Sequence, residues 1–512
     1  MERANLFNMP EIITLIGHCL PLWKYSERLG FYDFNPRILL KCTRVNKIWH
    51  DALIPMIWYI YNGYVMRSIP KDVIIKNSQY FRVFFYDRCF SGPFLCQNLR
   101  ALSISWWDSS LLPLVEANAG SLENLIWKGS TSTSPMRTMT LPKLDHGLFM
   151  RMAPTLEELQ LSHWTIVGPD FVRFLGACKR LQYLSLAAVD WVEPGPINSV
   201  LPASPSSPSS SPSATSVPWS TAIPPHIVQN LRDLRLDISV SRDGAFIDLI
   251  RSCPNLENFS LYSESAEDAR MLVPVLRDSC FSKLRGIEYV TRFSSALDGY
   301  DYLTDAEYSE IILSADTITH LKIDIPQLGD AMTRALILQA SSLQSLSLRF
   351  LRRRDMPMQD AENLCKILKY CIRLRSLSLV FSPHALGQEE TLRLFDEPWG
   401  CVELEKLELT DVTMVATEHR EVRATAGDIA AAVTAAAGEM YYDSELLPHI
   451  QQPRYWTWAS AAGSTPPDAG AHRAGSRNES VARQRLFEQV RKLGNLTRLT
   501  LNHVTYSADG AT

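Results

Sequence analysis

The stretch LQSLSL at residues 343–348 decides the fold, because it returns as LRSLSL at residues 374–379. In both copies two leucines alternate with a serine, which is typical of a β-strand with one apolar face. Twelve copies of the pattern L-x-x-L-x-L, some with another apolar residue in place of a leucine, begin at residues 99, 122, 156, 181, 231, 256, 284, 318, 343, 374, 404 and 496. The most frequent step between copies is 25 residues.

Helical patterns lie between the copies, for example at residues 244–255 and 360–373. A repeat of strand, turn and helix makes neighbouring strands parallel, because the helix supplies the crossover. Stacked copies then bury their leucines in one core that no single copy could form. The sequence therefore predicts an α/β solenoid over residues 99–512, with parallel strands on its concave face and helices on its convex face. Strands about 4.8 Å apart would form a sheet roughly 55 Å long, which suits a protein partner better than a small metabolite.

Two steps between copies are unusually long. The step of 50 residues after residue 181 holds a Pro/Ser-rich segment that cannot bury a core, and the step after residue 404 spans 92 residues. We expect disordered insertions at about 194–225 and 415–480. Ser-Pro pairs in the first insertion could be phosphorylated or could belong to an unmodified spacer. Trp456 and Trp458 in the second could hold it against the solenoid or anchor a partner.

Composition and charge are those of an ordinary folded protein. Of 512 residues, 46% are hydrophobic, and a net charge of −4 argues against a general nucleic-acid binder. No signal-peptide pattern and no membrane-spanning apolar run are seen, so we expect a cytoplasmic or nuclear protein that binds neither nucleic acid nor membrane. The ten cysteines include no C-x-x-C pair. Four of them precede a repeat leucine and are expected in the core, with metal ligation as the alternative: Cys178, Cys253, Cys280 and Cys371.

Catalytic motifs are missing from the sequence. It contains no nucleotide-binding loop, zinc-protease motif or nucleophile elbow, so we expect no enzyme, catalytic residue, cofactor or metal. The arginines of RFLRRRD at residues 349–355 could grip an acidic or phosphorylated segment, or form a solvated turn. Strand residues that alternate with the leucines should line the concave face. The candidate target-binding residues are Arg235, Asp237, Tyr262, His320, Lys322, Arg349, Lys406 and Glu408.

These repeats resemble the longer, helix-containing leucine-rich repeats of the ribonuclease-inhibitor-like class, and the step of 25 residues lies within the usual range for such repeats. Many repeats of that class place Asn or Cys eight residues after the first leucine, where the side chain bonds the turn backbone. Here that position holds Trp164, Val189, Ser239, Val412 and Val504. The backbone polar groups of this turn must therefore find other hydrogen-bonding partners.

The N-terminal region has helical periodicity. Residues 39–58 read LLKCTRVNKIWHDALIPMIW, in which Pro55 is expected to end the helix. One arc of this helix is apolar and holds Leu39, Cys42, Val45, Trp49, Ala52 and Leu53. Together with MPEIITLIGHCL at residues 9–20, the stretch resembles the F-box, a motif of about three helices. The departures are Met9, where Leu is usual, Asn46, where Cys is frequent, and an inserted segment at residues 23–36.

The resemblance implies a function. F-box proteins dock on a Skp-family adaptor, which links them to a cullin–RING ubiquitin ligase of the SCF type, while their repeats bind a target protein. The implied adaptor-docking residues are Pro10, Ile12, Leu40, Val45 and Trp49. On this interpretation residues 1–62 form an F-box-like module and residues 63–98 a linker or capping segment. The alternative is a non-catalytic scaffold or regulatory binding protein with no ubiquitin link, whose N-terminal helices only cap the solenoid.

Overall fold

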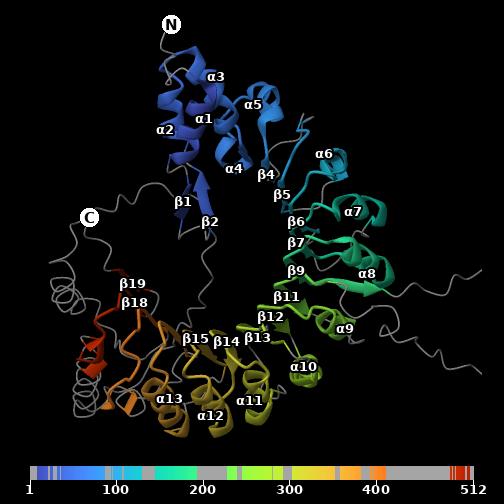
Figure 1. Cartoon of the computed structure of the whole chain (residues 1–512). Helices are drawn as coiled ribbons and strands as arrows, with labels where there is room; N and C mark the ends of the chain where they lie inside the picture. The colour runs from blue at the N-terminus through green and yellow to red at the C-terminus, as the bar shows by residue number, and fades with distance from the viewer. Residues whose placement is uncertain are drawn as a thin grey trace, which may run out of the picture. The chain divides into compact units, whose positions relative to one another are not determined.

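The computed structural model describes the N-terminal helices and most of the repeat region. The described residues are 9–20, 23–26, 31–34, 36–86, 94, 96–105, 109–129, 145–192, 228–238, 245–263, 265–278, 281–291, 302–351, 358–381, 393–394, 396–410, 485–486, 488–490, 492–501 and 504–507. The chain divides into unit 1 (Met1–Lys283 with Thr291–Ser295) and unit 2 (Leu284–Val290 with Ala296–Thr512). Both units are α/β with parallel strands (Figure 1).

Unit 1 begins with helices and a hairpin, and continues as a parallel sheet. Its helices are α1 (Pro10–Cys19), α2 (Arg37–Cys42), α3 (Lys47–Ile57), α4 (Gly63–Met66), α5 (Lys71–Asn77), α6 (Leu112–Asn118), α7 (His146–Met152), α8 (Gly168–Ala177), α9 (Ala245–Arg251) and α10 (Ala266–Asp278), with 3-10 turns at Ser78–Tyr80 and Ser109–Leu111. The sheet consists of β3 (Ile60–Asn62), β4 (Val83–Tyr86), β5 (Ala101–Ile104), β6 (Asn124–Lys128), β7 (Glu158–Ser162), β9 (Tyr183–Ala187), β11 (Asp233–Ile238) and β12 (Asn258–Ser263). Two smaller pairs are the antiparallel β1 (Trp23–Ser26) with β2 (Phe31–Phe34) and the parallel β8 (Thr165–Val167) with β10 (Asp190–Val192).

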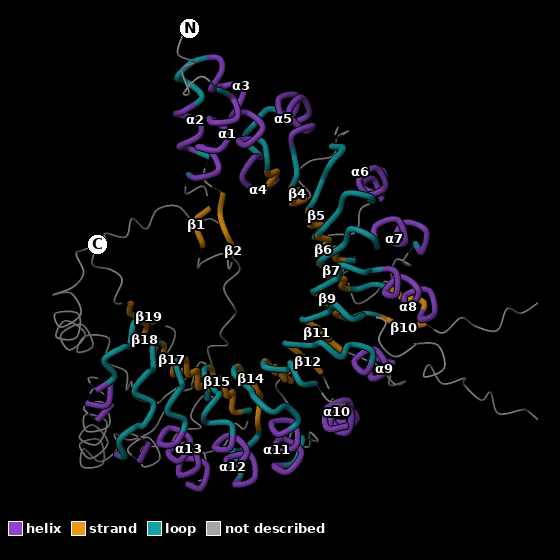
Figure 2. Tube along the Cα trace, viewed as in Figure 1, coloured by secondary structure: helices purple, strands orange, loops and turns teal. Residues whose placement is uncertain are grey.

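Unit 2 repeats the same alternation of strand and helix. Its strands are β13 (Gly286–Thr291), β14 (His320–Ile325), β15 (Ser345–Phe350), β16 (Ser376–Val380), β17 (Lys406–Thr410), β18 (Arg498–Leu501) and β19 (Val504–Ser507). All neighbours from β13 to β18 are parallel, and β19 returns antiparallel to β18. The helices are α11 (Asp305–Leu313), α12 (Asp330–Leu338) and α13 (Met358–Tyr370). These three helices lie on one side of the strands, where α12 packs against both of the others (Figure 2).

Each of the twelve sequence copies supplies one strand, namely β5 to β7, β9 and β11 to β18. One backbone carbonyl per repeat joins successive strands at their starts. The carbonyl of Thr319 accepts the N–H groups of Gln344 and Ser345, and the carbonyl of Gln344 accepts those of Arg375 and Ser376. The same two-for-one arrangement recurs in unit 1. Every repeat therefore enters the sheet at the same point of its leucine pattern, which fixes the register.

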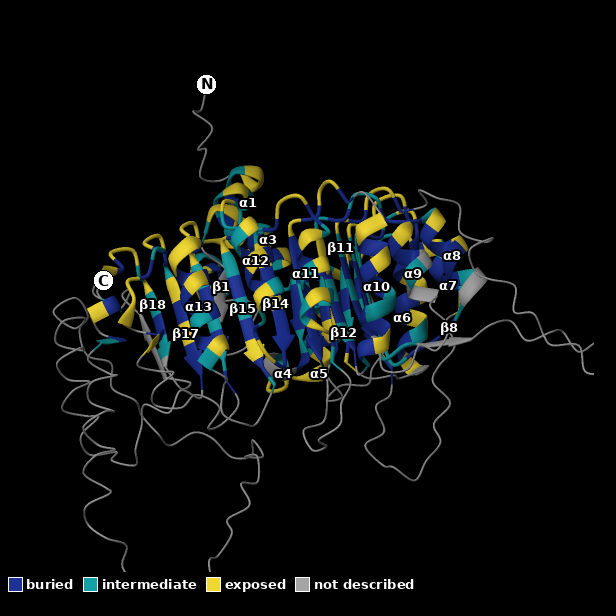
Figure 3. Cartoon of the chain, turned by 90° about the horizontal axis from the view of Figure 1, so that it is seen from below, coloured by how far each residue is buried: buried dark blue, intermediate teal, exposed yellow. Residues whose placement is uncertain are grey.

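The leucines of the pattern form the core. In β15, Leu346, Leu348 and Phe350 are buried, whereas Ser345 and Ser347 between them are only half-buried. Figure 3 shows buried residues, in dark blue, recurring along the strands and helices. The predicted α/β class with parallel strands is confirmed within each unit.

The sheet also contains two strands ahead of the first sequence copy. Phe81, Phe84 and Tyr86 take the three apolar positions of the pattern around β4, and all three are buried. A ring stack between Tyr61 of β3 and Phe84 joins this repeat to the preceding strand. An aromatic version of the repeat therefore lies within residues 63–98, which the sequence interpretation assigned to a linker or capping segment.

The stretch predicted as one helix over residues 39–58 is two helices, α2 and α3. The side chain of Asn46 accepts a hydrogen bond from the Trp49 N–H (3.0 Å), and this cap starts α3 afresh. Pro55 lies inside α3, so the prediction that it ends the helix is wrong. Proline has no N–H, so the helical bond to the Asp51 carbonyl is not made, and α3 ends two residues later at Ile57.

The turn position that holds Asn or Cys in similar repeats is filled by Trp164 in one repeat. Its buried indole donates Nε1–H to the backbone oxygen of Trp127 on the preceding repeat strand (3.0 Å). In the repeat of β5, the buried Asn118 side chain of α6 accepts the N–H of Leu99 (2.9 Å). Polar side chains from other positions thus satisfy the backbone groups at the ends of the strands.

Helices of unit 2 are also tied to one another by a carboxylate. Asp305, the first residue of α11, accepts the N–H groups of Ala331 (2.7 Å) and Met332 (3.0 Å) at the start of α12. The backbone of Gly329 runs against this carboxylate, because a Cβ at residue 329 would overlap its atoms. Asp305 therefore caps the helix of the next repeat, and Gly329 makes room for it.

Three of the four cysteines expected in the core are buried, namely Cys178, Cys253 and Cys371, whereas Cys280 lies outside the described residues. Burial raises the pKa of the Cys253 and Cys371 thiols to about 12. No helix in the described ranges is both long and apolar enough to cross a membrane. The expected insertions at about 194–225 and 415–480, with their Ser-Pro pairs, Trp456 and Trp458, lie outside the described residues, as do the last arginines of RFLRRRD.

Candidate functional site

One candidate surface is the open face of unit 2, by which we mean the strand side chains that alternate with the buried leucines of β14 to β17. Register pairing sets them in two rows, His320, Ser345, Ser376 and Lys406 in the first and Lys322, Ser347, Ser378 and Glu408 in the second. All eight are half-buried or exposed. Four consecutive repeats thus bring together basic, acidic and hydroxyl groups on one surface.

In the second row the acidic groups are already engaged. The ammonium group of Lys322 pairs with Glu288 on β13. The hydroxyl of Ser378 donates to a carboxylate oxygen of Glu408 across β16 and β17 (2.9 Å). Exposed pairs of this kind contribute only about 0–1 kcal/mol to stability. Their main effect is that the paired groups are less available to a partner than unpaired groups would be.

Beyond the second row, carboxylates are buried. Arg349 lies 3.6 Å from Asp324, whose side chain is only 1% exposed. Burying a carboxylate is costly unless a cation compensates it, and Arg349 supplies that charge. Asp237 takes the same position of the pattern in unit 1 and is 5% exposed, between Ala187 and Tyr262 on the flanking strands. It was expected to contact a target, but the flanking strands leave it too buried to do so.

The open face of unit 1 carries the other expected contacts. The guanidinium group of Arg235 on β11 lies 4.3 Å above the ring of Tyr262 on β12, a cation–π contact. Both side chains are half-buried. On the same pair of strands, Asn258 donates a hydrogen bond to Asp233. This surface is polar but largely occupied with its own contacts.

Of the residues expected to bind a target, five are exposed on neighbouring strands of unit 2, namely His320, Lys322, Arg349, Lys406 and Glu408. The serines of β15 and β16 that lie between them were not selected from the sequence. The signal for them was present, because each serine alternates with two leucines in the letters SLSL. Serine was not chosen because a serine side chain alone does not indicate a particular ligand.

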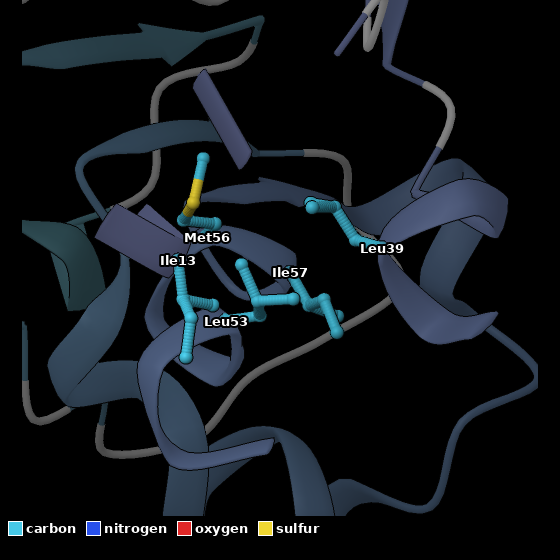
Figure 4. Packing of buried hydrophobic residues seen from close by; sticks show 5 residues of the cluster. All are labelled: Ile13, Leu39, Leu53, Met56 and Ile57. Atoms are coloured by element: carbon cyan, nitrogen blue, oxygen red, sulfur yellow. The ribbon is translucent and has the colours of Figure 1, made fainter. Parts of the chain in front are cut away.

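The second candidate surface belongs to the N-terminal helices. Their core consists of Ile13 from α1, Leu39 from α2 and three residues of α3, which are Leu53, Met56 and Ile57 (Figure 4). The backbone of α1 comes close to α3 at Gly17, where a Cβ would lie 2.6 Å from the Met56 sulfur. Helices α1, α2 and α3 thus pack as one small module.

This module exposes many apolar side chains. Of twelve large hydrophobic residues exposed among the described residues, six belong to it: Met9, Leu15, Ile38, Leu40, Val45 and Ile48. Leu40 is 47% exposed and Val45 is 61% exposed, and Pro10 is also exposed. Ile12 is half-buried, and Trp49 packs partly against the module core. The expected docking residues therefore divide into an exposed set (Pro10, Leu40, Val45) and a supporting set (Ile12, Trp49).

The described residues contain no group of His, Cys, Asp and Glu side chains that could hold a metal ion. Comparison with known proteins adds no relative, because no family model and no curated protein matches the chain.

Proposed function

We propose that this chain is a non-catalytic substrate-recognition adaptor of an SCF-type cullin–RING ubiquitin ligase. The module of α1, α2 and α3 docks on a Skp-family adaptor, and the open face of the repeat sheet binds the target protein. The observation that carries the proposal is the concentration of exposed apolar side chains on a three-helix module that precedes an array of parallel strand-and-helix repeats.

Exposed apolar side chains need a partner. Leu40 and Val45 stand beside the exposed cationic residues Lys41, Arg44 and Lys47. An apolar centre with a polar rim is the usual composition of a protein–protein interface. A terminal cap that served only the repeat array would present a polar outer surface instead.

The proposed mechanism is proximity. The module binds the ligase core and the open face holds the target, so lysines of the target stay near the ubiquitin-charged enzyme. Holding two reactants together raises their effective concentration without any catalytic group on this chain.

A second interpretation has its own support. Helix α3 ends at Ile57 and strand β3 starts at Ile60, so the module runs directly into the sheet. The ring of Trp58, between them, packs against Phe81 of the next repeat (6.2 Å between centroids). These contacts favour a scaffold protein whose module serves mainly as the N-terminal cap, with no ubiquitin link.

Binding to a purified Skp-family adaptor separates the two. Leu40→Asp and Val45→Asp should each weaken adaptor binding about tenfold or more, because each places a charge in the apolar contact. The matched control is Leu338→Asp at the end of α12, which introduces the same charge at a residue that is 71% exposed and lies outside the module. Calorimetric titration of the full chain gives the affinities. Unchanged binding by both module variants, or equal loss in the control, would contradict the adaptor function.

A further inference from the structure

Five large apolar side chains of unit 2 are exposed at the ends of its helices. Helices α11, α12 and α13 end at Leu313, Leu338 and Tyr370, and each of these last residues is exposed. Ile372 and Val402 are also exposed, and each lies two residues before the first leucine of a repeat copy. Single exposed hydrophobic residues are common on soluble proteins, but five at corresponding places of successive repeats form a patch. We call these five residues the apolar stripe.

Hydrogen bonds hold the members of the apolar stripe next to one another. The bonded pairs are the Gln339 side chain with the Ala315 carbonyl (2.9 Å), the Cys371 thiol with the Leu336 carbonyl (3.9 Å) and the Gly400 N–H with the Leu368 carbonyl (2.9 Å). The first pair joins the end of α12 to the end of α11, and the second joins α13 to α12 in the same way. The third brings the segment before Val402 against α13. The stripe is therefore continuous over four repeats and, with helices about 8–10 Å apart, roughly 30 Å long (Figure 1).

The middle of the apolar stripe is cationic. Arg334 lies one turn before Leu338 on the same face of α12, and Arg373 directly follows Ile372. Both arginines are exposed, and neither forms an ion pair within the described part of the chain. Exposed carboxylates near the stripe are Glu310 and Asp316 at its Leu313 end, and Glu397 and Glu403, which are paired with Lys369 (3.7 Å) and Arg375 (3.8 Å). An apolar surface with unpaired cations at its centre is complementary to a segment that is apolar and acidic.

The chain carries such a segment between β17 and β18. Residues 411–484 lie outside the described residues, and within them residues 439–447 read EMYYDSELL. These nine residues hold five large apolar side chains and three carboxylates, and residues 424–448 contain no lysine or arginine. Nine residues reach at most about 30 Å, so the segment is long enough to follow the stripe.

The connections of this segment keep it near the stripe. It is joined to unit 2 by 28 residues after Thr410, the last residue of β17, and by 37 residues before Arg485. Val402 of the stripe belongs to the same repeat as β17. Tethering of this kind gives an effective concentration on the order of millimolar, so even a weak contact would be occupied.

We infer that the apolar stripe is the docking site for residues 439–447 of the same chain, whose carboxylates lie beside Arg334 and Arg373. A second apolar segment of the insertion, RYWTW at residues 454–458, is less complementary because Arg454 adds another cation. A second copy of the chain would bring the same cations against the stripe. The inference concerns the insertion alone, so it does not depend on the proposed ligase role.

Photo-crosslinking in the full chain tests which segment covers the stripe. Tyr370→p-benzoylphenylalanine places a photoreactive ring on the stripe, and mass spectrometry identifies the peptide that becomes attached to it. We expect attachment to residues 439–447 within one monomer. The matched control is Lys406→p-benzoylphenylalanine on the open face of β17, the strand from which the insertion starts. Because proximity alone would act there as well, this position should attach to the segment at least about fivefold less often.

Competition measures the strength of the contact. In another variant of the full chain, nine glycine and serine residues replace residues 439–447, and a labelled peptide of residues 436–450 is titrated by fluorescence polarisation. This variant should bind the peptide about tenfold more tightly than the wild type, in which the tethered segment competes. Adding Arg373→Gln should weaken peptide binding about threefold or more, because it removes a cation from the stripe. The matched Lys406→Gln removes one positive charge from the open face and should change the affinity less than about twofold.

Several results would overturn the inference. Attachment of the Tyr370 probe to residues 454–458 or to a second copy of the chain would identify another occupant. Equal attachment from both probe positions, or none from Tyr370, would show that the segment does not dock on the stripe. The same conclusion would follow if the peptide failed to bind, or bound the wild type and the replaced chain equally. Equal effects of Arg373→Gln and Lys406→Gln would remove the charge complementarity on which the choice of segment rests.

Discussion

The contact between Asp305 and Gly329 predicts a specific non-additive effect. Asp305→Ala removes the acceptor of two N–H groups at the start of α12, which should cost about 1–2 kcal/mol of local stability. Gly329→Ala should cost a similar amount, because the new Cβ would push the carboxylate away and break the same two bonds. In the double variant no carboxylate remains to be displaced, so it should lose little more than Asp305→Ala alone.

Hydrogen exchange followed by mass spectrometry measures this effect in the peptide that covers α12. Exchange there should quicken roughly 5–30-fold in either single variant and by about the same factor in the double variant. Helix α13 is the internal control and should exchange as before. Additive losses in the double variant, or an unchanged α12 in Asp305→Ala, would refute the claim that one repeat caps the helix of the next.

Three further predictions concern single side chains. Trp164→Phe keeps an aromatic ring but is smaller and removes the N–H that bonds the Trp127 carbonyl, so it should lower the free energy of unfolding by about 1–3 kcal/mol. A melting temperature equal to that of the wild type would count against this bond. Ala188 has a positive φ of 48°, so Ala188→Gly should raise the melting temperature slightly, and a clear drop would contradict the assigned backbone. In the folded chain an alkylating reagent at mildly alkaline pH should modify the exposed Cys19 and spare Cys253, because burial raises the pKa of the Cys253 thiol to about 12. Peptide mapping measures the labelling of each cysteine, and equal labelling would disprove the burial of Cys253.

The strands were predictable because their signal is local. Leucines that alternate with polar residues mark a buried strand face whatever surrounds them, and every copy of the pattern became a strand. The aromatic repeat with Phe81 and Phe84 escaped because aliphatic residues defined the search pattern. Asn46 was read as a departure from a family motif, although a side-chain cap also starts a new helix there.

The candidate surfaces were only partly predictable. Alternation indicates which strand residues point away from the core, and it correctly placed Lys322 and Lys406 on the open face. It does not tell which residues become neighbours, since the partner of Lys322 on β13 depends on the register between repeats. Nor does it foresee that Asp237 is enclosed by its neighbours, because burial at the end of a strand depends on side chains from two other repeats.

The short junction between α3 and β3 limits how far the helical module can move relative to the first strands of the sheet. Only Trp58 and Tyr59 separate the helix from the strand, and Trp58 is packed against Phe81, so the junction has little freedom to swing. A flexible linker spreads its population over a broad range of separations, so the effective concentration at any one separation is low. A stiff connection concentrates the population at a few separations. If the module docks as proposed, the first repeats of unit 1 would keep a nearly fixed orientation relative to the docked adaptor, and a longer or glycine-rich junction would lose that orientation.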